Sequence, residues 1–216
     1  MVHSYNQAMK KQRPQTQLGR PVNEHARQER INQILDGARR CFVERGFHAS
    51  STAQISAAAG VSVANLYQYF PTKEALIAAL IEVDLERHAE MISRVWETDL
   101  SPQGIKKALE GIFLTKEGHA IAVLRAEIAS EGGRNPEVAD LLRRSEASLF
   151  ALLRRSILQA QNAGRVSPDL DPVAVGERLS LVFEGVMRLY VFSPADGESL
   201  LDRYYSQLGE TLGRCP

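Results

Sequence analysis

Apolar residues in this chain recur three and four positions apart, and this spacing constrains the fold more than any other feature. In the stretch that begins near residue 23, Ile31, Ile34, Leu35, Ala38 and Phe42 fall on one side of an α-helix. No segment alternates apolar and polar residues over a useful length, so we expect no β-sheet. The pattern predicts an all-α protein with about nine helices.

Capping residues and breakers set the expected helix boundaries. Ser51, followed three residues later by Gln54, has the spacing of a capping box. Gly118 is expected to separate a helix over 102–116 from the next one. An N-cap residue followed by proline at the first helical position predicts two further helix starts, at Asn135-Pro136 and Asp171-Pro172.

Basic residues are concentrated in the first third of the chain. Ten basic and four acidic residues occur up to and including Lys73, which gives this part a net charge of +6. Because the whole chain is neutral, the residues after Lys73 carry a net charge of −6. Such a division suits a polyanion-binding head on an acidic body, although scatter over solvated helix faces gives the same numbers. Residues 1–22 hold no acidic residue and no apolar period, so we expect a disordered basic arm there.

Several functional classes find no support in the sequence. No apolar run reaches the roughly 18 residues that span a bilayer, and no signal peptide is recognisable, so we expect a cytoplasmic protein without membrane contact. Cys41 and Cys215 are too far apart for a metal motif, and the histidines lack metal-ligand spacing. No P-loop, HExxH, GxSxG, CxxC or GxGxxG pattern occurs. We therefore expect neither an enzyme nor a protein with a metal or cofactor.

Residues 51–70 carry the pattern that points to function. Two short helices flank Gly60, where a left-handed backbone is inexpensive only for glycine. The small side chains of Ala57, Ala58 and Ala59 let the helices cross closely. This is the pattern of a helix-turn-helix, whose second helix enters the DNA major groove, although alanine-rich hairpins also occur as plain core.

A longer set of residues resembles the N-terminal domain of the TetR family of transcriptional regulators. The resemblance covers about residues 27–80, and residues 127–142 (EIASEGGRNPEVADLL) are similar to effector domains of that family. It implies a DNA-binding domain over 23–71 with three helices, and an effector-binding and dimerisation domain over 72–216 with about six. The residues that carry it are Gly46-Phe47, Ser51-Thr52, Ile55, Ala58-Ala59-Gly60-Val61-Ser62, Leu66-Tyr67, Phe70 and Lys73-Glu74-Ala75-Leu76.

The resemblance implies roles for ten residues on double-stranded DNA. Helix-start residues and two longer side chains would meet phosphates: Ser51, Thr52, Ser62, Tyr67 and Lys73. The exposed first turn of the recognition helix, where base contacts are made, would hold Val63, Ala64 and Asn65. Gln68 and Tyr69 follow on the same helix, and the side-chain amides of Asn65 and Gln68 can bond bidentately to adenine. Gln68 stands where many members have an aromatic residue and Tyr69 where many have histidine, which leaves the operator sequence open. Leu66 and Phe70 are expected in the core.

The same resemblance implies a small-molecule pocket in the second domain. Candidate pocket residues, each of which is alternatively ordinary core or interface, are Met91, Trp96, Phe113, His119, Arg125, Glu127, Phe183, Met187 and Tyr190. Arg125 and Glu127 are costly to bury unless they are paired or ligand-bound. The last two helices resemble those that form a homodimer in the family, as a palindromic operator requires.

Together these features predict a repressor that a small-molecule effector of unknown identity releases from its operator. Two alternatives stay open. One is a TetR-like DNA-binding regulator without an effector, and the other is an activator.

Overall fold

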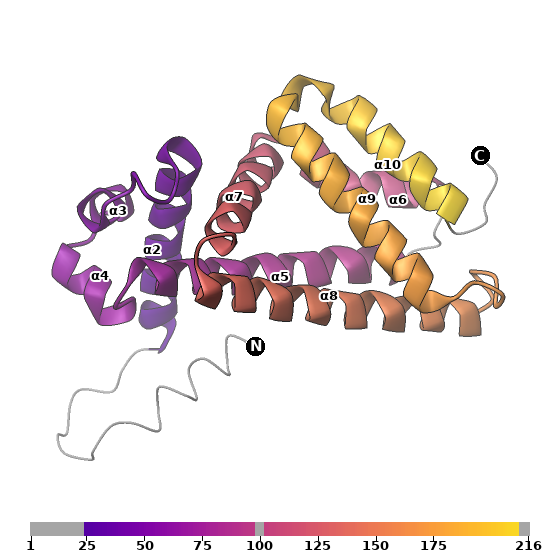
Figure 1. Cartoon of the computed structure of the whole chain (residues 1–216), viewed down its shortest axis with the longest axis horizontal. Coiled ribbons are helices and arrows are strands. Elements are labelled where there is room, and N and C mark those ends of the chain that lie inside the picture. Colours follow the sequence, from indigo (N-terminus) through magenta and orange to yellow (C-terminus); the bar gives the residue numbers. More distant parts are fainter. Residues whose placement is uncertain (1–23, 98–101, 212–216) are drawn as a thin grey trace, which may run out of the picture. The chain divides into compact units, whose positions relative to one another are not determined.

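The computed structural model describes residues 24–97 and 102–211, which form nine α-helices and one short 3-10 helix without any strand (Figure 1). The predicted all-α class is therefore confirmed. None of the described helices combines the length and apolarity needed to cross a bilayer. The expected basic arm over 1–22 and Cys215 lie outside the described residues.

The chain divides into two compact units, and the boundary lies inside one helix, between Val83 and Asp84. The first unit holds α2 (Glu24–Arg45), α3 (Thr52–Ala59), α4 (Val63–Tyr69) and the first part of α5 (Lys73–Glu97). Its core consists of side chains from all four helices and includes Ile34, Phe42, Ile55, Leu66 and Leu76. Leu66 and Phe70 are buried, as predicted.

Glycine allows the closest approach in this unit, between α2 and α3. A Cβ atom added to Gly37 would lie 2.8 Å from both the Cβ and the backbone nitrogen of Ala59. Gly60 ends α3 with φ of 65°, and Gly46 follows α2 with φ of 80°, both in the left-handed region. The sequence predicted that Ala57, Ala58 and Ala59 let the two motif helices cross closely. The close contact found at Ala59 is instead with Gly37 on α2.

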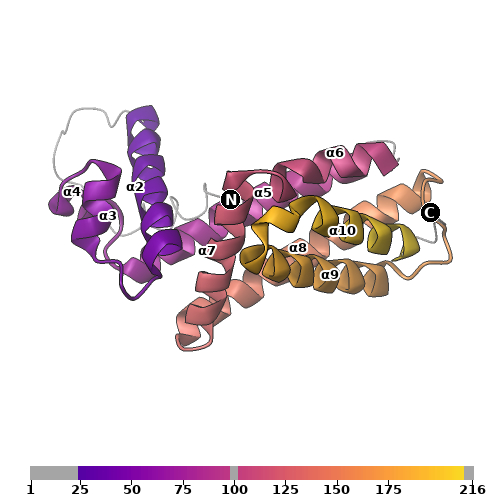
Figure 2. The same cartoon turned by 90° about the horizontal axis from the view of Figure 1, so that it is seen from above.

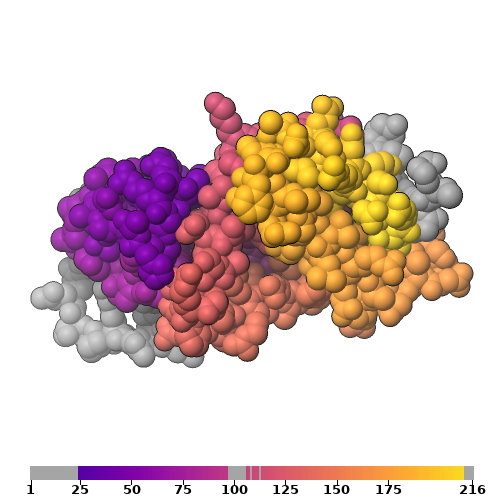
Figure 3. All heavy atoms as spheres, turned by 45° about the horizontal axis from the view of Figure 1, so that its top comes forward, coloured from indigo at the N-terminus to yellow at the C-terminus, as the bar shows by residue number. Residues whose placement is uncertain are grey.

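The second unit contains the remainder of α5 and five further helices. They are α6 (Pro102–Phe113), α7 (Lys116–Gly132), α8 (Pro136–Asn162), α9 (Pro172–Phe192) and α10 (Gly197–Thr211), with the 3-10 helix η1 (Pro194–Asp196) between the last two. α9 lies beside α8 and α10, and α10 also packs against α6 (Figure 2). Figure 3 shows α9 and α10 next to each other on one face of this unit.

Most predicted helix starts are confirmed by side-chain caps, and one boundary was wrong. Asn135 accepts hydrogen bonds from the backbone N–H groups of Glu137 and Val138, and Asp171 accepts one from Val173. Gly118, expected to separate two helices, lies within α7. The break comes earlier because Thr115 caps α7, accepting a hydrogen bond from the Gly118 N–H at 2.9 Å.

Candidate DNA interface and ligand pocket

Serine hydroxyls fix the N-termini of both motif helices. Ser51 accepts a hydrogen bond from the Gln54 N–H, and the Gln54 side chain accepts one from the Ser51 N–H, which completes the predicted capping box. Ser62 caps α4 by accepting a hydrogen bond from the Asn65 N–H at 3.1 Å. These bonds set where each helix begins, and the positive end of each helix dipole lies there.

Helix α4 has a buried side and an exposed side. Leu66 is fully buried, whereas Val63 is 40% and Tyr67 is 47% exposed. Ala64 and Gln68 are also exposed, and Asn65 and Tyr69 are partly so. An exposed helix face that includes a valine and a tyrosine is available to a partner, because the unit's own core does not use it.

Polar side chains on this face are joined to each other. The Thr52 and Tyr67 hydroxyl oxygens lie 3.3 Å apart, which brings the start of α3 next to the exposed face of α4. The Asn65 side chain donates a hydrogen bond from Nδ2 to Oε1 of Gln68 at 3.1 Å. The exposed face of α4 and the start of α3 form a single surface, which we call the motif surface: Ser51, Thr52, Ser62, Val63, Ala64, Asn65, Tyr67, Gln68 and Tyr69.

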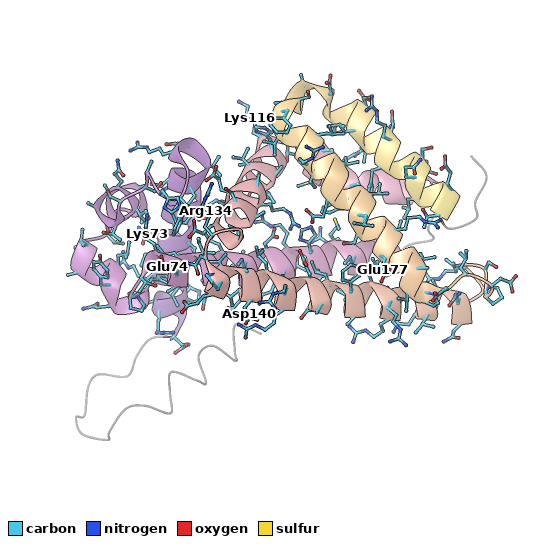
Figure 4. The ribbon with its side chains drawn as sticks, viewed as in Figure 1. Lys73, Glu74, Lys116, Arg134, Asp140 and Glu177 are labelled. Atoms are coloured by element: carbon cyan, nitrogen blue, oxygen red, sulfur yellow. The ribbon has the colours of Figure 1, made fainter. Side chains whose placement is uncertain are left out.

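Lys73 is the first residue of α5 (Figure 4), and its side chain is hydrogen-bonded to the loop between α2 and α3. Its Nζ donates hydrogen bonds to the carbonyl oxygens of Phe47 at 2.9 Å and Ser50 at 3.1 Å, and lies 4.3 Å from the centre of the Phe47 ring. An ammonium group has three donors, so these two bonds leave one N–H for a further acceptor. Lys73 thus has a structural role in addition to the phosphate contact expected from the sequence.

The second unit contains a pocket with mostly apolar walls. The volume of this cavity is about 70 Å³. Each of the helices α5 to α10 contributes to its lining. The lining residues are His88, Met91, Ile92, Val95, Trp96, Leu109, Arg125, Leu149, Phe150, Leu153, Leu179, Ser180, Phe183, Glu184, Tyr204 and Leu208. Such a combination of apolar walls and a few polar groups is typical of a small-molecule site.

The polar groups of the pocket are organised around Arg125. Its Nη1 donates to Oδ2 of Asp84 on α5, and its Nη2 donates to Oε1 of Glu184 on α9. Nδ1 of His88 lies 3.2 Å from Nη1 of Arg125 and 3.5 Å from Oδ2 of Asp84. The ring of Phe183 stacks edge-on against His88, with centroids 5.1 Å apart. Three helices therefore meet at one guanidinium.

Charge pairing outweighs burial in this cluster. Burial alone raises the pKa of the Asp84 carboxyl, but the hydrogen bond with His88 and the charge of Arg125 hold this pKa below its usual value. Burial likewise disfavours the charged Arg125 guanidinium, yet Asp84 and Glu184 raise its pKa. The Asp84–Arg125 pair is thus charged at neutral pH. The Asp84 side chain is largely buried, whereas the Glu184 side chain is 55% exposed.

Family comparisons match both units. The model for "Bacterial regulatory proteins, tetR family" matches residues 34–80, and the model for "BetI-type transcriptional repressor, C-terminal" matches residues 103–212. The second match covers about half of the chain. The chain belongs to the TetR family. TetR-family proteins are transcriptional regulators, so it is a helix-turn-helix regulator and not an enzyme.

Individual TetR-family relatives agree with this assignment. The HTH-type transcriptional regulator UidR of Escherichia coli K12 is 33% identical over 158 residues, covering 71% of this chain and 78% of UidR. The HTH-type transcriptional repressor AcnR of Corynebacterium efficiens is 29% identical over 180 residues, covering 83% and 86% of the two chains. The structure of Salmonella enterica GusR aligns with a TM-score of 0.71 at 28% identity, covering 92% of this chain and all of that one.

A solved structure of lower sequence identity shares the fold. FadR of Bacillus subtilis in complex with stearoyl-CoA aligns with a TM-score of 0.63 at 19% identity, covering 82% of this chain and 98% of FadR.

Four of the residues expected in a TetR-type effector pocket line the observed one: Met91, Trp96, Arg125 and Phe183. The other five lie elsewhere. Phe113, Met187 and Tyr190 are core residues, and the Phe113 and Tyr190 rings stack 5.7 Å apart. His119 packs edge-on against Tyr190, with its Nε2 lying 3.3 Å from the Val191 carbonyl oxygen. Glu127 is partly buried and does not line this pocket.

Sequence reasoning missed four residues with polar groups in this TetR-family pocket: His88, Ser180, Glu184 and Tyr204. His88 follows Asp84 by one helical turn, a spacing that places both side chains on one face of α5. Burial raises the pKa of the Tyr204 hydroxyl, so Tyr204 stays neutral. Glu184 sits next to Phe183 within an apolar helix, and its charge is the one local signal that could have marked it.

Proposed function

We propose that this regulator represses transcription by binding a palindromic operator as a homodimer, and that a small molecule in the second-unit pocket weakens this binding. The motif surface would contact one DNA half-site. Val63, Ala64, Asn65, Gln68 and Tyr69 would face base edges, while Ser51, Thr52, Ser62, Tyr67 and Lys73 would lie near phosphates. Such a protein acts where the chromosome lies, in the cytoplasm.

The exposed face of α4 carries the DNA-binding part of the proposal. Val63 and Tyr67 are large and exposed, whereas Leu66 on the same helix is fully buried. Asn65 and Gln68 carry the side-chain amides that bond bidentately to adenine, and Val63 and Ala64 can touch a thymine methyl group. The Thr52–Tyr67 contact supports simultaneous docking of both motif helices, since one side chain from each would meet the same stretch of backbone.

The surface of α9 supports a homodimer through the last two helices. Leu181 and Phe192 are each 73% exposed, and Leu189 is 41% exposed. Gly185 lies between the two leucines, and a Cβ atom there would meet nothing within 4 Å. α10 exposes no large apolar side chain over its described length. We infer that α9 supplies the apolar centre of the contact and α10 its polar margin, which a second copy would cover by two-fold symmetry.

Helix α5 gives the effector a physical route to the DNA-binding unit. It begins at Lys73 in the first unit and continues to Glu97 in the second, where Asp84 bonds to Arg125. A ligand that rearranges the Arg125 cluster would change the environment of α5. The ligand switches DNA binding only if it prefers one arrangement of the protein, with about 1–3 kcal/mol of coupling free energy between the two sites.

Two similar proteins support repression and ligand control as proposals for this chain. AcnR is named a repressor, and the FadR structure contains stearoyl-CoA.

The test is transcription in vitro from the promoter nearest to the protein's own gene. We expect the full-length protein to lower transcript yield. A competing duplex that contains an operator selected from a random DNA library should restore the yield. Replacing Asn65 and Gln68 together by alanine should abolish repression. Replacing exposed Gln159 and Asn162 of α8 by alanine is the matched control and should leave it intact. Increased transcript yield would contradict the repressor assignment, and an unchanged yield with retained operator binding would contradict it as well.

A further inference from the structure

We infer that the ligand of the second-unit pocket is an organic carboxylate with an apolar body, and that its carboxylate takes the place of Glu184 on Arg125. This inference rests on the proposed function, in which that pocket holds the effector.

The hydrogen bonds of the Arg125 guanidinium are incomplete. Nε and Nη2 lie on one edge of a guanidinium and together match the two oxygens of a carboxylate. In this structure Glu184 contacts Nη2 only. Nε is buried and has no hydrogen-bond partner within the described part of the chain. A buried N–H donor without a partner is costly, so an acceptor that engages both Nε and Nη2 is favoured there.

The two carboxylates that now hold Arg125 differ in how easily they are displaced. Asp84 is largely buried, with its side chain 21% exposed, and it also contacts His88. The Glu184 side chain is 55% exposed in a single copy of the chain. Exposed ion pairs contribute little, whereas breaking a buried pair strands a charge. A ligand would therefore displace Glu184 and leave Asp84 in place.

Charge balance then selects a carboxylate over other ligands. One guanidinium (Arg125) and two carboxylates (Asp84 and Glu184) together carry one net negative charge. Exchanging Glu184 for a ligand carboxylate keeps that charge unchanged near Arg125, while Glu184 moves to water. An amine would have to approach the guanidinium with like charge, and a neutral amide would give up the charge-assisted bonds. The aromatic side chains of Trp96, Phe183 and Tyr204 offer the walls for an apolar body.

The experiment measures binding of phenylacetate, phenylacetamide and phenethylamine to the full-length protein by calorimetry. These probes share the aromatic body and differ in the polar group. We expect phenylacetate to bind at least about tenfold more tightly than either of the others, the worth of one charge-assisted hydrogen bond. Phenylacetate that fails to bind at millimolar concentration, or that binds no more tightly than the amide or the amine, overturns the inference.

Two variants test the exchange on Arg125. Glu184→Gln weakens the internal competitor and should tighten phenylacetate binding about two- to fivefold, with no change for phenylacetamide. Glu177→Gln, an exposed position on the same helix (Figure 4), is the control and should change neither. Arg125→Lys keeps the charge but loses the paired donors, so phenylacetate binding should weaken at least about tenfold. Where Arg125→Lys does not fold, the Glu184→Gln comparison decides: unchanged or weaker phenylacetate binding overturns the exchange.

Selective duplex binding by the same preparations separates the two hypotheses. If the unsubstituted protein binds all duplex sequences equally well, the proposed function is contradicted. Selective DNA binding without any preference for the carboxylate contradicts the ligand inference alone.

Discussion

The hydroxyl oxygens of Tyr67 and Thr52 lie 3.3 Å apart, so the exposed face of α4 and the first residue of α3 meet at one polar contact. Each oxygen has a lone pair and a rotatable O–H, and only one of the two protons is used between them. The other proton is available to an anion in front of both helices. The contact thus fits two hydroxyls that share a phosphate when DNA binds.

Removing the Tyr67 hydroxyl should weaken binding to DNA of any sequence. We expect Tyr67→Phe to lower affinity about tenfold for specific and nonspecific duplexes alike, because a phosphate contact positions the protein without reading sequence. The salt dependence should not change, since the tyrosine carries no charge. Fluorescence anisotropy at several salt concentrations measures both quantities. Tyr205→Phe in the second unit is the matched control, and loss of affinity confined to one sequence would contradict the assignment.

Replacing Lys73 should affect both stability and the salt dependence. Lys73→Met removes two hydrogen bonds to the Phe47 and Ser50 carbonyls, so we expect the first unit to lose about 1–3 kcal/mol of unfolding free energy in urea. It should also lower the slope of log affinity against log salt by about 0.9, the contribution of one neutralised phosphate. Lys116→Met, at an exposed helix start in the second unit, should change neither. An unchanged slope with reduced stability would remove Lys73 from the phosphate contacts.

The close crossing of α2 and α3 should not tolerate a methyl group. In Gly37→Ala the new Cβ would lie 2.8 Å from the backbone nitrogen of Ala59, which a small rotamer change cannot relieve. We expect the first unit to lose about 1–3 kcal/mol of stability, measured by chemical denaturation. Gly111→Ala in α6 has open space around the new methyl group and should stabilise by up to about 1 kcal/mol. Equal effects at the two positions would contradict the packing argument.

A charge on the exposed face of α9 should prevent dimerisation. Leu181→Glu places a carboxylate where the proposed interface is most apolar, and we expect a monomer in sedimentation experiments at micromolar concentration. Leu158→Glu on α8, at a site that is 40% exposed, should leave the dimer intact. A Leu181→Glu variant that remains dimeric would move the interface away from α9.

Local sequence patterns predicted most of the fold, because caps and breakers act within a few residues. The Ser51–Gln54 capping box and the Asn135 cap are examples. The Gly118 error has the same origin, since glycine was read as a break although the nearby Thr115 hydroxyl could cap the next helix. Periodicity likewise identified Phe113 and Tyr190 as inward-facing residues, but it does not distinguish a filled core from a pocket wall.

Interaction partners that are far apart along the chain could not be predicted from the sequence pattern. The expectation that Arg125 needs a partner if buried agrees with its bonds to Asp84 and Glu184. These partners lie 41 and 59 residues away along the chain, and no local spacing identifies them. The same limit explains why Lys73 was assigned to phosphate alone, since its carbonyl partners belong to a loop more than 20 residues earlier.

The most direct measurement of the central claim is selection of bound duplexes from a random DNA library by the full-length protein. Two copies of the motif surface related by two-fold symmetry should enrich an inverted repeat, with half-site centres about one helical turn, ~10 base pairs, apart or a multiple of it. The Asn65→Ala variant should return a repeat with altered bases and similar spacing. No enrichment, or enrichment of a single asymmetric site, would contradict the account.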